Sequence, residues 1–184
     1  MKIFLKLKHW QMFCLFFVIP VLFFQFAGTL NHMDEDNTMN IIRYIFYVIL
    51  IFAFFIGWLY NMGTTLYKKI PSSYIIRLYK LKIAIIFPVC YMIFWFFVST
   101  FNQSFTSRYT GDYKELALTL IFLTYAFIVI VVYQAARILT SAENKRIAKF
   151  TESLENFFLI CLFPIGIWFI QPKVNKLSSE EDKI

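Results

Sequence analysis

The chain has 184 residues, of which 60% are hydrophobic and 21% aromatic, and its formal net charge is +7. Its apolar blocks are too long and too many for the core of one soluble domain, and they are continuous rather than alternating, which argues against a transmembrane β-barrel. We therefore predict an all-α membrane protein forming a single transmembrane domain over residues 1–184. The expected architecture is a four-helix transmembrane bundle followed by a short re-entrant or fifth hydrophobic helix. Basic cytosolic loops account for the net charge, so direct nucleic-acid binding is not expected.

The first span is predicted over residues 12–30. The cations Lys2, Lys6 and Lys8 precede it, which predicts a cytoplasmic N-terminus. The apolar run is longer than the core of a signal peptide and lacks a good cleavage site, so we expect it to be retained. Pro20 lies in the middle of the run, where a kink is expected.

The second span is predicted over residues 44–61, and a basic connector follows it. This connector contains no acidic residue, and its cations are Lys68, Lys69, Arg77, Lys80 and Lys82. Apolar residues alternate with the cations after Pro71. Two interpretations stay open: an interfacial helix attracted to anionic lipid headgroups, or a docking face for an acidic cytosolic partner.

The third and fourth spans are predicted over residues 83–101 and 116–136. A second basic connector follows, with Lys145, Arg146 and Lys149. Within it, Thr140-Ser141-Ala142-Glu143 fits the pattern of a capping box. We therefore predict that an amphipathic helix begins at Thr140 and lies at the membrane surface.

The last apolar stretch, residues 157–170, decides the topology. Its 14 residues would reach about 21 Å as a helix, against about 30 Å of hydrocarbon. If the stretch turns back, the cations that follow it lie on the cytosolic side, which gives the stronger positive-inside bias. We favour a re-entrant segment hinged at Pro164, which lacks an N–H, and at Gly166, which allows a positive φ. A short fifth span remains the alternative.

The aromatic and polar side chains of the spans have simpler interpretations. Trp10, Trp58 and Trp168 are predicted to be interfacial anchors. The polar residues within or at the ends of spans are predicted to form hydrogen bonds between helices. They are Gln25, Asn61, Ser99, Thr119, Thr124, Tyr125 and Gln134.

No chemistry-bearing constellation is found in the sequence. The middle of every predicted span lacks an ionisable residue, which argues against proton relays and ion-coupled transport. Cys14, Cys90 and Cys161 are separate, and His9 and His32 lie on opposite sides of the first span. We therefore predict a non-enzymatic protein with no cofactor, metal or catalytic site.

The two ends of the chain resemble known segments. K-L-K-H-W-Q-M-F (Lys6 to Phe13) and F-P-I-G-I-W-F-I-Q-P-K-V-N-K (Phe163 to Lys176) resemble sequences that recur together in uncharacterised small multi-span bacterial inner-membrane proteins. The resemblance implies a multi-pass protein of the bacterial inner membrane. It also implies that the two ends act together.

Two functional classes follow from these observations. The first is a non-enzymatic, homo-oligomeric membrane anchor or sensor subunit that couples the bilayer to a cytosolic protein partner. Its basic cytoplasmic surface would consist of Lys68, Lys69, Arg77, Lys80, Lys82, Lys145, Arg146 and Lys149. The alternative is an oligomeric channel whose terminal segments line an axis between subunits. The membrane component of a bacterial immunity or phage-defence system fits either class.

Overall fold

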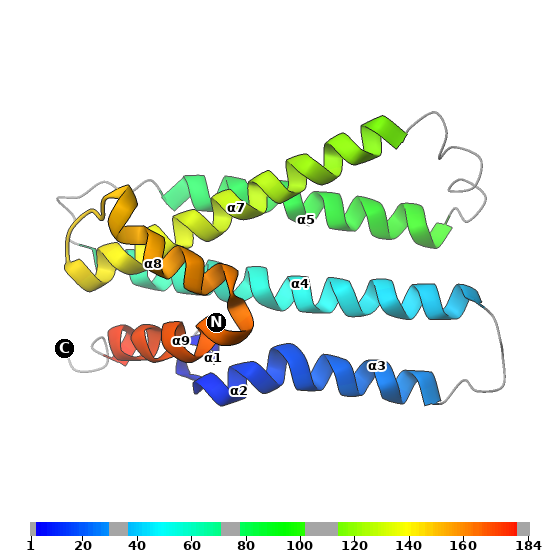
Figure 1. The fold of residues 1–184 in the computed structure, drawn as a ribbon, viewed down its shortest axis with the longest axis horizontal. Helices are drawn as coiled ribbons and strands as arrows, with labels where there is room; N and C mark the ends of the chain where they lie inside the picture. The colour runs from blue at the N-terminus through cyan, green and yellow to red at the C-terminus, as the bar shows by residue number, and fades with distance from the viewer. Residues whose placement is uncertain (1–2, 30–36, 71–77, 102–113, 180–184) are drawn as a thin grey trace.

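A computed structural model describes residues 3–29, 37–70, 78–101 and 114–179 of the chain (Figure 1). Within these ranges every regular element is a helix. The all-α prediction is therefore confirmed. The prediction also assigns four of the helices to the membrane, and the helical content alone does not establish that part.

The first predicted span is an interrupted helix. α1 (Ile3–Lys6) and α2 (His9–Phe13) lead into a π-helical turn, η1 (Cys14–Val18), and then into α3 (Ile19–Thr29). The N–H of Ile19 donates to the Cys14 carbonyl, which is the wide π-type bond. Pro20 has no N–H, and its ring crowds the preceding helical turn, which is why a kink was expected. The wider π-helical turn just before Pro20 makes room for the ring.

Three long helices run alongside one another: α4 (Asn37–Tyr67), α5 (Leu78–Phe101) and α7 (Lys114–Asn144) (Figure 1). Two segments of the described chain are long and apolar enough to cross a bilayer, Phe46–Tyr67 in α4 and Leu118–Asn144 in α7. Both helices extend past their predicted ends by several residues. The other two predicted spans lie in α5 and in the helix around η1, and their crossing of a membrane remains a prediction.

Buried side chains concentrate at one end of the bundle, where α8 and α9 join α4 and α7. Leu59, Met62 and Leu66 of α4 are fully buried there, in the same core cluster as α7 residues such as Leu139. Toward the other end, large apolar side chains stay exposed, as Phe122 does at 72%. Exposed apolar side chains in such numbers are typical of a surface that contacts a membrane or another protein.

The last apolar stretch is divided between two helices that form a hairpin. α8 (Phe150–Cys161) is capped by Leu162, whose φ of −85° and ψ of 44° leave the helical region. α9 (Phe163–Ser179) begins directly afterwards, and the N–H groups of Ile165 and Gly166 both donate to the Leu162 carbonyl, at 2.9 and 2.8 Å. In Figure 1, α9 runs back toward the end of the molecule where α8 begins. The segment therefore reverses direction within a single residue.

The structure assigns different roles to Pro164 and Gly166 from those predicted. Pro164 lies in the first turn of α9, where a missing N–H removes no helical hydrogen bond. No described glycine has a positive φ, so that part of the hinge prediction is wrong. Gly166 is instead buried at the α8–α9 contact, where a Cβ atom would overlap the carbonyl oxygen of Leu159. The absence of a side chain allows the two helices to meet.

The predicted helix start at Thr140 is also wrong, because α7 continues through this residue. The Thr140 hydroxyl donates to the Ala136 carbonyl, 3.0 Å away within the same helix. α7 ends where Lys145 adopts a φ of 50° and the Arg146 N–H donates to the Ser141 carbonyl at 3.2 Å. This is the Schellman pattern of a helix C-terminus, with lysine at the position that glycine usually occupies.

We expect Gly166→Ala to lower the free energy of unfolding by about 1–3 kcal/mol, because the added methyl group forces α8 and α9 apart. Gly57→Ala is the matched control: Gly57 is also helical, but a Cβ there meets no atom within 4 Å. The control should be neutral or stabilising by up to about 1 kcal/mol. Unfolding in detergent micelles measures both variants, and equal effects would contradict the close contact.

Candidate functional site

A buried glutamine joins the two ends of the chain to the centre of the bundle. The Gln171 amide nitrogen in α9 donates to the carbonyl oxygens of Phe4 and Leu7, at 2.8 and 3.0 Å. Its amide oxygen accepts a hydrogen bond from the Trp58 indole N–H in α4, at 3.0 Å. Gln171 and Trp58 have no exposed surface. One side chain thus connects α9 to α4 and to the N-terminal segment.

The local sequence explains why these carbonyls need a partner. α1 ends at Lys6, and Lys8 caps α2 with an extended backbone, so the helical hydrogen-bond ladder is interrupted between them. Carbonyls at a helix end must find partners outside the helix. Gln171 supplies one amide group, and Asn175, one turn further along α9, donates a second bond to Leu7 at 3.0 Å. We call Trp58, Gln171 and Asn175 the amide node.

Aromatic rings pack beside the amide node along the same contact. The Phe163 ring lies 4.6 Å from Phe16 and 5.3 Å from Trp58, both in edge-to-face geometry. The His9 ring lies 4.5 Å from Trp168. The segments Lys6–Phe13 and Phe163–Lys176, which the resemblance singled out, are therefore in direct contact. The family resemblance itself remains a prediction.

The tryptophans divide into two kinds. Trp10 and Trp168 are 50% and 46% exposed, as interfacial anchors would be. Trp58 is completely buried, so its prediction as an interfacial anchor is wrong. A buried indole N–H needs an acceptor, and Gln171 provides it.

A second polar cluster connects the hairpin to the end of α7. Asn156 in α8 is buried, and its amide nitrogen donates to Thr140 at 2.9 Å and to Glu143 at 3.1 Å. The Lys173 ammonium group in α9 donates to the Asn156 amide oxygen at 3.0 Å. It also pairs with Glu143 at 3.6 Å and with Glu155 at 3.4 Å. These contacts hold Lys173 at the same end of the bundle as the end of α7.

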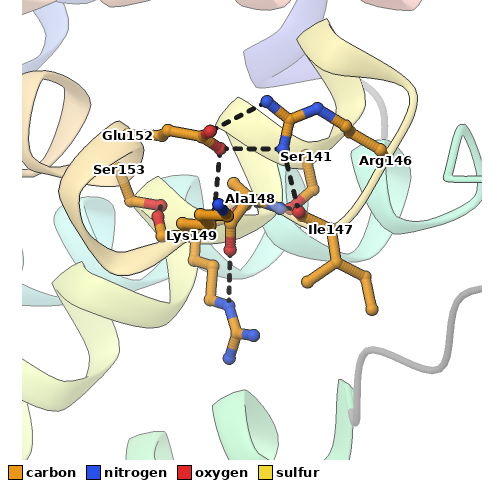
Figure 2. Close-up of polar contacts among 8 residues, drawn as sticks. Ser141, Arg146, Ile147, Ala148, Lys149, Glu152 and Ser153 are labelled. Carbon is orange, nitrogen blue, oxygen red and sulfur yellow. Dashed lines mark hydrogen bonds and ion pairs between the residues drawn. The ribbon is translucent and has the colours of Figure 1, made fainter.

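A network of main-chain and side-chain bonds fixes the turn between α7 and α8 (Figure 2). The Ala148 N–H donates to the Ser141 hydroxyl at 3.0 Å. Arg146 donates two bonds to the Glu152 carboxylate, at 3.1 and 2.8 Å, and the Lys149 N–H donates a third at 3.0 Å. Glu152 therefore caps the first turn of α8, a role that the sequence pattern had given to Glu143.

These bonds to the Glu152 carboxylate also determine how it titrates. The side-chain hydrogen bonds from Arg146 are the largest cause, followed by the bond from the Lys149 N–H, and together they lower the pKa of Glu152. A carboxyl group with a lowered pKa in the folded state adds stability above its ordinary pKa, and this stability is lost as the pH falls through the lowered value. Protonation of Glu152 at acid pH should consequently weaken the turn.

The cations of the predicted basic surface lie at helix ends that meet at one end of the bundle (Figure 1). Lys68 and Lys69 lie in the turn directly after α4, and the N-terminus of α5 carries Lys80 and Lys82. The turn after α7 carries Lys145, Arg146 and Lys149. Arg77 lies outside the described residues. A common function for these cations remains a prediction.

The predicted hydrogen bonds between helices are wrong for three polar residues of the spans. Asn61, Thr119 and Thr124 donate to carbonyls one turn earlier in their own helices, at 2.7–2.8 Å. In the described part of the chain, side-chain bonds between distant elements come instead from residues on either side of the last apolar stretch, including Asn156, Gln171, Lys173 and Asn175. The sequence does contain a signal for these bonds: the short apolar stretch 157–170 has an amide residue directly before it and an amide and a lysine directly after it.

Among the described residues, no group of three or more His, Cys, Asp or Glu side chains is arranged to hold a metal ion. Cys14, Cys90 and Cys161 are free thiols. The amide node and the polar cluster around Asn156 and Lys173 both connect helices to one another.

No family model matches the chain, and comparisons with curated proteins and with solved structures find no similar protein.

We expect Gln171→Leu to lower the free energy of unfolding by about 2–3 kcal/mol, because it leaves the Trp58 N–H and the Phe4 and Leu7 carbonyls without this partner. Gln25→Leu is the matched control, since Gln25 is exposed on α3. Identical stabilities for the two variants would contradict a structural role for the amide node.

Proposed function

We propose that the chain is a non-enzymatic, multi-pass protein of the bacterial inner membrane. In this proposal it is a homo-oligomeric anchor or sensor subunit that couples the bilayer to a cytosolic partner. Four helices cross the membrane, including α5 and the helix around η1. The α8–α9 hairpin enters the inner leaflet and returns.

The observation that carries this proposal is the reversal at Leu162 together with the contact between the chain ends. α8 has 12 residues and spans about 18 Å, which is too short to cross about 30 Å of hydrocarbon. The tip of the hairpin is apolar and exposed, with Phe158, Leu162 and Ile165 between 57% and 64% exposed. An apolar tip between two polar ends suits a segment that dips into one leaflet.

The charge distribution supports a cytosolic face at the hairpin end. The described cations of both connectors, together with Lys173 and Lys176, belong to helix ends that gather there (Figure 1). Cytosolic loops of membrane proteins carry such an excess of Lys and Arg. Lys68, Lys80, Lys82, Lys145 and Lys149 are exposed and suit anionic headgroups or an acidic protein surface. The channel alternative relied on unwound backbone around Pro164 and Gly166, and both residues are helical.

Reporter fusions test the proposed topology. A green fluorescent protein fused after Ile184 should fluoresce, and an alkaline phosphatase fused there should be inactive, because the hairpin returns the C-terminus to the cytosol. Fusions at the N-terminus should give the same pattern. An active phosphatase at Ile184 would contradict the hairpin topology, and purification without detergent would contradict the membrane assignment.

A further inference from the structure

An apolar groove lies between α4 and α5. Its volume is about 510 Å³, within the range of small-molecule sites, and its lining is almost entirely hydrocarbon. Phe46 and Ile93 line one part, and Tyr60 and Ile85 line another. The core positions described above lie elsewhere, where α4 meets α7 and α9.

Small residues of α4 create the hollow. Ala53 and Gly57 are one turn apart, so they lie on the same face of the helix, and both line the groove. A Cβ added to Gly57 meets no atom within 4 Å, which independently shows that the space above this residue is empty. Bulkier walls, including Val89 and Met92 of α5, stand opposite.

The dimensions and polarity of the groove fit one kind of ligand. From Phe46 to Tyr60 the helix rises about 21 Å, more than the roughly 15 Å of one leaflet of hydrocarbon. An extended alkyl chain fills a long, narrow space of this kind without needing a hydrogen-bond partner. A polar ligand would find almost nothing to bond to in the lining.

Charge indicates where the ligand's polar end lies. Beyond Ile85, toward the N-terminus of α5, Lys82 and Lys80 are exposed within two helical turns. Lys68 and Lys69 lie in the turn after α4, at the end of the bundle toward which α4 runs from Tyr60. The opposite end of the groove has Arg43 one turn before Phe46, so the excess of cations is at the Lys82 end.

We infer that this groove binds one acyl chain of an anionic phospholipid, whose headgroup lies at Lys80 and Lys82. The inference rests on the proposed membrane location of α4 and α5 and adds a specific lipid site to it. A bound lipid would place an anionic headgroup on the basic connector, one of the two kinds of contact that the proposed function gives to these cations.

Photo-crosslinking tests the inference. The full-length protein is reconstituted in phosphatidylcholine vesicles with a trace of phosphatidylglycerol that carries a diazirine on its acyl chain, and adducts are mapped by mass spectrometry. Adducts should concentrate on Ala53–Gly57 and Ile85–Met92. Ala53→Leu, which fills the groove, should reduce them about tenfold. Ala126→Leu is the matched control: Ala126 is exposed on α7 outside the groove, so the same added bulk should leave labelling unchanged.

The headgroup assignment has its own comparison. The phosphatidylglycerol probe should label the groove several-fold more than a phosphatidylcholine probe, and Lys80→Gln with Lys82→Gln should remove this difference. Labelling spread evenly over exposed helix faces, or an equal effect of the two leucine variants, would overturn the site. A protein that is not labelled on any helix would refute the proposed membrane location instead, so the two failures are distinguishable.

Discussion

The fold depends on the hydrogen bonds that the Gln171 amide forms inside the bundle. The amide oxygen accepts a hydrogen bond from the Trp58 indole N–H in α4. The amide nitrogen donates to the carbonyls of Phe4 and Leu7 in the N-terminal segment, where the helix is interrupted. An unpaired polar group costs about 1–3 kcal/mol in a protein interior and more in hydrocarbon. For this reason α9 is held against α4 and the N-terminal segment together, and its position determines that of α8.

The close contact between α8 and α9 follows from the same arrangement. α9 reaches the amide node only if the chain reverses after α8, and the reversal brings the Gly166 backbone against Leu159. Lys173 then lies beside Glu143 and Asn156, where its charge is paired at the end of α7. The hairpin is therefore fastened at its base by ionic and amide contacts, while its apolar tip remains exposed.

Much of the fold followed from the sequence because long apolar blocks have few alternatives to helices. The hairpin was only partly predictable: the shortness of the stretch favoured a turn over a fifth span, but Pro164 and Gly166 suggested a hinge where the structure has a helix start and a close contact. The capping-box pattern at Thr140 misled because α7 packs against α4 and α8, and this packing continues the helix past a good cap. Trp58 was misassigned because its partner, Gln171, lies 113 residues away. Pairings over such separations depend on tertiary packing, which periodicity does not encode.

The distance between Lys8 and Lys176 tests the central claim most directly. Both side chains are exposed, and their neighbours Leu7 and Asn175 are hydrogen-bonded at 3.0 Å. Spin labels at these two positions, in a variant with its cysteines replaced by serine, should show strong dipolar coupling at a distance well below about 30 Å, the hydrocarbon thickness. A reference pair at Lys8 and Glu115, near the start of α7, should be separated by more than that thickness. If the Lys8–Lys176 pair is instead about 30 Å apart or more, the terminal segment crosses the bilayer and the hairpin account is wrong.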